Sequence, residues 1–310
     1  MPDFHVVRLD EVTFDCSPEL AAMYKLSPCV WREHDRYSLL VRVVNYSANP
    51  SEKIARIHYG ESANGLRFTL DEVPVVAPGP DIPGSYDSGG CEDPTVAFDD
   101  GTYYVYYSGW NERVKRGELL LASGSDLHDL YKQGIALPSS SAAANPKEAT
   151  IVRAPGGTWR LFFEYAHDGR STIGIARSAS PAGPWEVLAP LFGPRAEAWD
   201  SWHLSTGPIA DSNASSPVMF YNGATQSAQW RIGWMVFDAD YTRVVARSEQ
   251  PLILPHIKRN NDDSDIAFAA SAVEVDGVIH LYYSVSDQYI MRAIIARIGD
   301  ESSAGFPTAY

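Results

Sequence analysis

Cysteine is scarce in this sequence, and the three that are present, Cys16, Cys29 and Cys91, have no metal-ligand spacing. A disulfide framework needs pairs of cysteines, so an odd number without regular spacing indicates a reducing compartment instead. Clusters of His, Cys and Asp with metal-ligand spacing are also missing, as is a glycine-rich phosphate loop. We therefore expect neither a metal nor an organic cofactor.

Long hydrophobic runs are missing as well. The chain has no stretch of about eighteen apolar residues, although a membrane-spanning helix needs about that many. Charged residues interrupt the N-terminal segment, so no secretion signal is predicted there. These absences favour a cytoplasmic protein without a membrane partner.

Positive charge is the third shortage. The chain has 25 Lys and Arg residues against 39 Asp and Glu residues, which gives a net charge of −14. Nucleic acids and anionic membrane surfaces require a basic stripe, so neither partner is expected. The charge favours a neutral or cationic small molecule as the partner, and no pattern points to an oligomeric state.

What the sequence has instead is a repeated short run of aromatic and β-branched residues. The run occurs five times, and its members end at equivalent residues that are 66, 56, 58 and 62 positions apart. A turn signal precedes each run, and a second strand-like segment follows it. The equivalent residues that end the five runs are Arg42, Ser108, Glu164, Asn222 and Ser284.

This spacing predicts an all-β fold, a five-bladed β-propeller with four short antiparallel strands in each blade. A large β-sandwich is the alternative, but it gives no reason for the regular spacing. One catalytic domain is predicted over residues 1–300, followed by a C-terminal tail over 301–310. The predicted blades span approximately residues 27–75, 90–135, 146–190, 203–250 and 266–298.

The register of the runs predicts where the chemistry is located. We take the runs as the innermost strands, which line the central channel of a propeller, so that the residues leading into them share one funnel. Counting back eleven to thirteen residues from the centre of each run reaches Ser27, Asp93, Glu148, Ser205 and Ala269. The second and third blades thus each contribute a carboxyl group at matching depth.

Asp93 is the candidate catalytic acid. It lies in the segment 89–95, between glycines and a proline and just ahead of the aromatic run that contains Tyr107. We expect a loop there, which is where functional groups are often carried, although an Asp before Pro is also a common turn former. Cleavage of a glycosidic bond requires two carboxyl groups, one protonated and one ionised. The second carboxyl is either Glu148 or Glu164, an acid inside an otherwise apolar run.

Further candidate contacts come from polar and aromatic residues near the strand ends. Asp200 and His203 lie in the segment 199–208, just before the fourth aromatic run. Tryptophans such as Trp110 and Trp230 are possible stacking platforms for a sugar, although most such side chains pack in the core.

Several segments resemble glycoside hydrolase family 130, the β-mannoside phosphorylases and hydrolases built on a five-bladed propeller. Residues 90–94 resemble its Gly-x-Glu-Asp-Pro-Arg signature, in which the Asp is the general acid, and 40–42 resemble its Leu-Tyr-Arg. Segments 199–208, 221–223 and 282–287 resemble its Trp-Asp, Tyr-His-Gly and Tyr-Tyr-Gly-Ala-Ala-Asp elements. Together with the register, the resemblance implies that Arg42 and Asp287 contact the terminal sugar. The further substrate contacts that it implies are Ser27, Tyr107, Asp200, His203 and Asn222.

The departures from the family pattern concern positive charge. Where the family has basic residues, this chain has Thr95, Asn222, His203 and Glu164, while Arg113 and Arg116 lie near another phosphate-contact position. A phosphate nucleophile needs cations, and a carboxylate about 4 Å away repels it by roughly 1 to 4 kcal/mol. We therefore predict an exo-acting inverting hydrolase that uses water on β-mannosides or a related glycoside. The alternatives are a β-mannoside phosphorylase releasing mannose 1-phosphate, a β-arabinofuranosidase-type glycosidase and a non-catalytic sugar-binding propeller.

Overall fold

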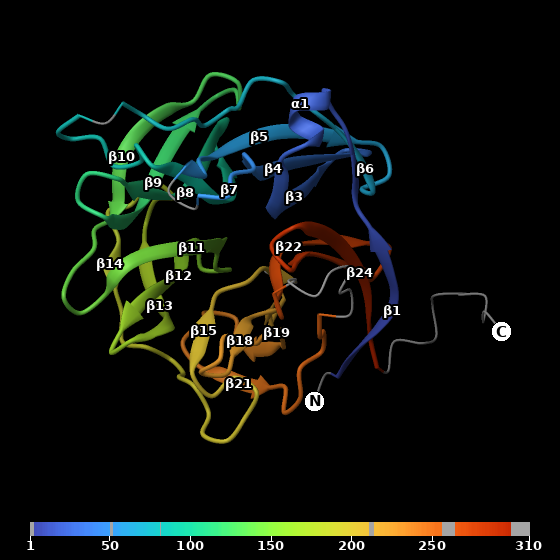
Figure 1. Cartoon of the computed structure of the whole chain (residues 1–310). Coiled ribbons are helices and arrows are strands. Elements are labelled where there is room, and N and C mark those ends of the chain that lie inside the picture. The colour runs from blue at the N-terminus through green and yellow to red at the C-terminus, as the bar shows by residue number, and fades with distance from the viewer. Residues whose placement is uncertain (1–2, 50–51, 81, 211–213, 256–263, 299–310) are drawn as a thin grey trace.

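The computed structural model describes residues 3–49, 52–80, 82–210, 214–255 and 264–298 (Figure 1). Within these residues the regular structure is almost entirely β-strand, so the predicted all-β class is confirmed. One short helix, α1 (Pro18–Ala21), occurs there, and Ser17 caps its first turn. In the described part of the chain no helix is long and apolar enough to cross a membrane. The predicted tail, 301–310, lies outside the described residues.

The first three sheets follow one another along the chain, and their strands are antiparallel except for the parallel pair β2 and β6. The first sheet contains β2 (Thr13–Asp15), β3 (Tyr24–Glu33), β4 (Arg36–Val44), β5 (Ala55–Ser62) and β6 (Arg67–Leu70). The second contains β7 (Gly90–Asp99), β8 (Thr102–Asn111), β9 (Arg116–Gly124) and β10 (Tyr131–Leu137). The third contains β11 (Ala144–Arg153), β12 (Trp159–His167), β13 (Arg170–Ser178) and β14 (Glu186–Val187).

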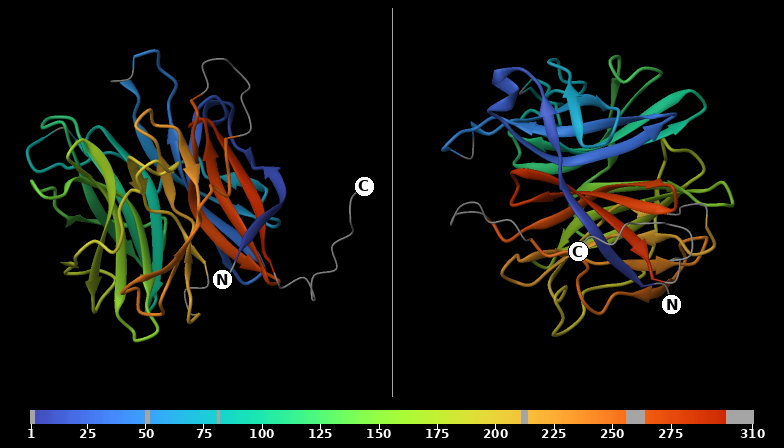
Figure 2. Two further views of the ribbon diagram at one scale, coloured as in Figure 1. Left: turned by 90° about the horizontal axis from the view of Figure 1, so that it is seen from below. Right: turned by 90° about the vertical axis from the view of Figure 1, so that its right-hand side faces the viewer.

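The fourth region is divided into two small sheets, and the fifth sheet includes the N-terminal strand. The small sheets are β15 (His203–Ser205) with β18 (Asn222–Ala224) and β19 (Trp230–Ile232), and β16 (Ile209–Ala210) with β17 (Val218–Met219), β20 (Met235–Phe237) and β21 (Val244–Arg247). The fifth sheet contains β22 (Ala267–Val275), β23 (Val278–Val285), β24 (Tyr289–Arg297) and β1 (Phe4–Glu11). The pairing of β1 with β24, which the sequence did not predict, joins the two ends of the described chain (Figure 2).

Apolar side chains from the second strand of each sheet pack against the neighbouring sheets. Successive residues of a strand point to opposite faces, and on these strands both faces are covered. On β8, Tyr106 packs toward the third sheet and Tyr107 toward the first. On β23, Tyr282 packs toward the first sheet and Tyr283 toward the fourth region. Each hydrophobic cluster thus connects two neighbouring sheets. The clusters join the first sheet to the second, the second to the third, the third to the fourth region, the fourth region to the fifth sheet, and the fifth sheet back to the first.

The prediction that the aromatic runs are the innermost strands is wrong. The runs form the second strands, β4, β8, β12, β17 with β18, and β23. The strands that precede them, such as β3, β7 and β11, contact one another across sheets and lie toward the common centre seen in Figure 1. The runs are apolar because neighbouring sheets cover both of their faces. Asp93 correspondingly lies within β7 and not on a loop.

Candidate active site

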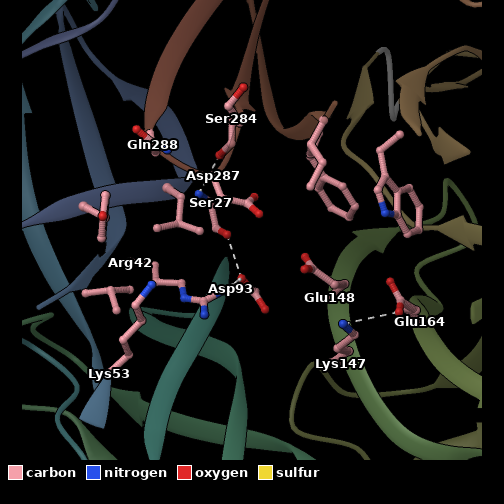
Figure 3. A pocket seen from close by; sticks show the side chains of 17 residues that line it. Ser27, Arg42, Lys53, Asp93, Lys147, Glu148, Glu164, Ser284, Asp287 and Gln288 are labelled. Carbon is pink, nitrogen blue, oxygen red and sulfur yellow. Dashed lines mark hydrogen bonds and ion pairs between the residues drawn. The ribbon is translucent and has the colours of Figure 1, made fainter. Parts of the chain in front are cut away.

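A cavity of about 440 Å³ lies where the first, second, third and fifth sheets meet. No group of three or more His, Cys, Asp or Glu in the described residues is arranged to bind a metal ion. Trp230 of the fourth region completes the cavity wall, and Lys53, Lys147 and Phe268 also line it. Figure 3 shows six of the predicted site residues around this space: Ser27, Arg42, Asp93, Glu148, Glu164 and Asp287.

Three cavity residues occupy the same backbone position on successive sheets. Ser27 on β3, Asp93 on β7 and Glu148 on β11 have φ angles of 50°, 50° and 48°, which are uncommon for residues other than glycine. The strand register shifts at each of them, as it does at a β-bulge, which redirects a side chain. Counting back from the centre of each aromatic run in the sequence had selected these same three residues. The sequence repeat therefore located the bulges.

Second-strand serines on neighbouring sheets fix two of these bulges. The Ser27 amide donates to Oγ of Ser284 at 2.9 Å. The Glu148 amide donates to Oγ of Ser108 at 3.3 Å. Both serines are at the equivalent end positions of the aromatic runs, so a side chain at this position stabilises the bulge of the next sheet.

Asp93 is buried, with 5% of its surface exposed. Its Oδ1 accepts hydrogen bonds from Ser27 Oγ at 2.6 Å and from Arg42 Nη1 at 3.2 Å. Burial by itself raises the pKa of a carboxyl group. Here the Arg42 charge and the Ser27 hydrogen bond outweigh burial and lower the pKa of Asp93. The surroundings of Asp93 thus favour its ionised form.

Glu148 behaves in the opposite way. Loss of solvent around its carboxyl group raises the pKa of Glu148 well above its ordinary value, and repulsion from Asp93 raises it further. Each carboxyl group thus influences the pKa of the other, so the two titrate as a coupled pair. The opposite directions of the two pKa shifts favour the protonated form at Glu148, whereas the sequence predicted Asp93 as the proton donor.

Glu164 forms an ion pair at the cavity wall. It is 3% exposed on β12 and lies opposite Lys147 in the sheet, with Lys147 Nζ 3.4 Å from Glu164 Oε1. This carboxylate is the largest cause of the raised pKa of Lys147. Lys147 was not predicted as a site residue, although a signal existed. Like Glu92 before Asp93, it is the charged residue directly before a bulge.

Two predicted contacts lie in buried hydrogen-bond networks away from the cavity. Asn222 is fully buried, and its Oδ1 accepts from the Ala269 amide at 2.7 Å. Tyr107 is buried between sheets and donates to Asp87 Oδ2 at 2.9 Å. Neither lines the cavity, so the structure does not bring them together with Asp93.

Asp200 and His203 are also outside the cavity lining. Asp200 is fully buried and paired with Arg247 at 2.6 Å and with Arg195 at 3.0 Å. The ring of His203 stacks against Trp230 with a centroid distance of 5.8 Å. His203 thereby supports a residue of the cavity wall.

The charges around the cavity refine the prediction about phosphate. Of the four positions that depart from the family's basic residues, Glu164 lines the cavity, whereas Thr95, Asn222 and His203 do not. Arg113 and Arg116 border a separate cavity of about 290 Å³. The described lining of the central cavity contains four carboxyl groups (Asp93, Glu148, Glu164, Asp287) and three cations (Arg42, Lys53, Lys147).

Comparison with known proteins identifies the family. A family model described as β-1,4-mannooligosaccharide phosphorylase, of glycoside hydrolase family 130, matches residues 27–298. The chain belongs to glycoside hydrolase family 130. The resemblance seen in the sequence motifs is thus confirmed.

Relatives within family 130 are distant in sequence. A 1,2-β-oligomannan phosphorylase of Thermoanaerobacter sp. (strain X514) is 24% identical over 248 residues, which cover 78% of this chain and 79% of the relative. Among solved structures, a β-1,2-mannobiose phosphorylase from Listeria innocua in complex with β-1,2-mannobiose has a TM-score of 0.75 at 19% identity, covering 93% and 96% of the two chains. A family 130 structure associated with glycoside hydrolases that target β-1,2 mannosidic linkages in Candida mannan has a TM-score of 0.72 at 23% identity, covering 88% and 84%. These structures share the fold of this chain.

Proposed function

We propose that this protein cleaves a β-mannoside, or a glycoside with similar hydroxyl stereochemistry, from the non-reducing end in the central cavity. The observation that carries the proposal is the pair Asp93 and Glu148, whose pKa values shift in opposite directions. Such a pair can keep a proton and deliver it to a leaving oxygen. Membership of family 130 and the mannoside activities of the named relatives support the substrate class.

In the proposed step, water attacks the anomeric carbon while the glycosidic bond to the leaving oxygen breaks. The Asp93–Glu148 pair gives its proton to the leaving oxygen, and Glu164 accepts a proton from the attacking water. This single displacement inverts the configuration at the anomeric carbon. Arg42 and Asp287, at the cavity wall, hydrogen-bond to hydroxyls of the terminal sugar.

Water is the nucleophile that the cavity charges favour. Arg42 is already paired with Glu92 at 2.7 Å and with Asp93, and Lys147 is paired with Glu164. The three cations of the cavity lining are matched by four carboxyl groups, and a phosphate ion about 4 Å from a carboxylate is repelled by roughly 1 to 4 kcal/mol. Phosphorolysis is the second candidate, because the curated relatives are named as phosphorylases.

The sheets support a single five-bladed propeller domain as the scaffold. In this assignment the two small sheets of the fourth region form one split blade, and β1 completes the fifth. The closed order in which the hydrophobic clusters join neighbouring sheets supports the count. The strands begin and end close to the blade limits predicted from the sequence.

Product analysis with and without phosphate tests the function. The protein is incubated with β-1,2-mannobiose, β-1,4-mannobiose and an aryl β-arabinofuranoside, and the products are separated by chromatography. Free mannose formed equally well without phosphate is the expected result. Mannose 1-phosphate formed only with phosphate would identify a phosphorylase. Binding without any product would identify a sugar-binding protein and overturn the proposal.

A further inference from the structure

A small cavity lies at the centre of the fold, next to the carboxyl pair. Its wall comes from β3, β7, β11 and β22 and from the segment that joins β15 to β16, so every region of the fold contributes to it. Asp93 and Glu148 line both this cavity and the central one. The carboxyl pair therefore lies between the two spaces. The polar side chains around the small cavity are those of Ser27, Asp93, Glu148, Thr150 and Thr206.

The size of this cavity fits a water molecule. Its volume is about 20 Å³. A buried water needs at least about 10–15 Å³ and two to four polar partners, whereas sites for small organic molecules measure about 300–1,000 Å³. The cavity is therefore large enough for water and too small for a sugar.

Two threonine hydroxyls of the wall form a short hydrogen-bond chain. Thr206 Oγ1 donates to Thr150 Oγ1 at 3.0 Å, and Thr150 Oγ1 donates to the Gly207 carbonyl at 2.9 Å. A hydroxyl has one hydrogen and two lone pairs, so both hydrogens are used within this chain. Thr206 Oγ1 keeps only lone pairs for a further bond. Because Thr206 is 3% exposed, the cavity is where it can accept one.

The carboxyl pair offers the groups that complete a water site. The hydrogen bonds that Asp93 accepts from Ser27 and Arg42 both end on Oδ1, so Oδ2 can accept another. The protonated form of Glu148, which its surroundings favour, has a hydrogen to donate. A water in the cavity can accept from Glu148 and donate to Asp93 and Thr206. These three partners are within the two to four that a buried water requires.

We propose that a water molecule binds in the small cavity beside the carboxyl pair and that Thr206 orients it. The inference rests on the proposed function and extends it. A water whose hydrogens point to Thr206 and Asp93 presents its oxygen to Glu148. In this orientation it favours the proton on Glu148 and the negative charge on Asp93. Thr206 does not line the central cavity, so it is a positioning residue that acts on the acid through the water.

The first test is the pH dependence of kcat. Thr206→Val keeps the shape of the side chain but removes the acceptor, so the water is no longer oriented to favour the proton on Glu148. The loss of activity at high pH should then begin roughly 0.5 to 1 pH unit lower, the effect of about one hydrogen bond on a pKa. Thr206→Ser keeps the hydroxyl and should restore the native profile.

Ser248→Ala is the matched control for the kinetic test. It removes another buried hydroxyl, which accepts from the Trp234 amide at 3.1 Å and does not line either cavity. Its pH profile should be that of the native protein. A native profile in Thr206→Val, or an equal shift in Ser248→Ala, overturns the proposal.

The second test does not require turnover. An atomic-resolution crystal structure of the native protein should show one water in the cavity, with oxygen partners about 2.5–3.0 Å away. Contacts of about 2.0–2.4 Å would identify a metal ion instead. A metal ion or an empty cavity overturns the proposal. If the native protein cleaves no glycoside, the proposed function fails, and this structure alone decides whether the water site exists.

Discussion

Two buried aspartates of this protein have similar partners and different surroundings. Arg42 Nη1 is 3.2 Å from Asp93, and Arg247 Nη2 is 2.6 Å from Asp200. Asp93 faces a cavity with Glu148 beside it, whereas Asp200 is fully buried and does not line that cavity. An acid that is buried against an arginine is therefore not by itself a candidate for catalysis. The open space and the second carboxyl group distinguish Asp93.

Asp93→Asn tests the aspartate that lines the cavity. Of the predicted changes in activity and stability, its effect should be the largest. We expect kcat/KM to fall by about 10²- to 10⁴-fold, the usual contribution of general acid–base catalysis. Arg42 keeps its ion pair with Glu92 in this variant, so the melting temperature should change less than in Asp200→Asn. Initial rates and thermal melts of the same preparations measure both. Retention of most of the activity would exclude Asp93 from the acid pair.

Asp200→Asn tests the buried aspartate that does not line the cavity. The substitution removes a fully buried carboxylate from the partly buried Arg195 and Arg247, and breaking such an ion pair costs about 3–5 kcal/mol of stability. We expect urea denaturation to show this loss while KM of the folded protein stays near the native value. Asp168→Asn, at a side chain that is 81% exposed, is the control and should be nearly neutral. A large change in KM with intact stability would make Asp200 a substrate contact after all.

Glu148→Gln tests, through the pH dependence of stability, whether the second carboxyl group beside Asp93 binds a proton. The folded-state pKa of Glu148 is raised above its unfolded value of about 4.3. Between those two pKa values the folded protein binds a proton that the unfolded chain has lost. Wild-type stability therefore falls as pH rises through this window, by up to about 1.4 kcal/mol per pH unit, and levels off above the folded pKa.

Gln at position 148 cannot ionise. The stability of Glu148→Gln relative to wild type should therefore increase with pH through the same window and then become constant. Urea denaturation at steps from about pH 4 to pH 8 measures the difference. A difference that does not change with pH would mean that Glu148 is ionised in the folded protein, and that the pair does not keep a proton.

The sequence repeat located the cavity residues even though the strand roles were misassigned. Ser27, Asp93 and Glu148 precede their aromatic runs by nearly constant distances, and this spacing holds whichever strand is innermost. The run containing Tyr106 and Tyr107 is apolar at successive positions but does not line a channel. That pattern comes from neighbouring sheets that cover both faces of the second strand.

Motif likeness could not show where the matched side chains point. Asp200 and Asn222 lie in segments that resemble family elements, yet each lies in a buried network formed with residues distant in the sequence, such as Arg247 and Ala269. The direction of a side chain depends on bulges and strand register, which a short motif does not encode. The position of Lys147 directly before Glu148 was a signal in the sequence, but only its strand pairing reveals Glu164 as its partner.

Ser108→Ala has the smallest expected effect and tests whether the second-strand serines act on the site. Ser108 Oγ accepts from the Glu148 amide, whereas Ser178 Oγ on β13 accepts from the Ser180 amide at 3.1 Å. The two serines are 6% and 7% exposed, so each alanine substitution should cost about 0.5–1.5 kcal/mol of stability.

The kinetics should separate these two serines. Ser108 fixes the bulge that directs Glu148 toward Asp93, so Ser108→Ala should lower kcat several-fold and shift its pH dependence. Ser178→Ala should leave both unchanged, because its hydrogen bond fixes a turn outside the cavity. Urea denaturation and pH–rate profiles of the pair provide the comparison. Equal kinetic behaviour would mean that the bulge keeps its shape without Ser108, and that strand pairing alone positions Glu148.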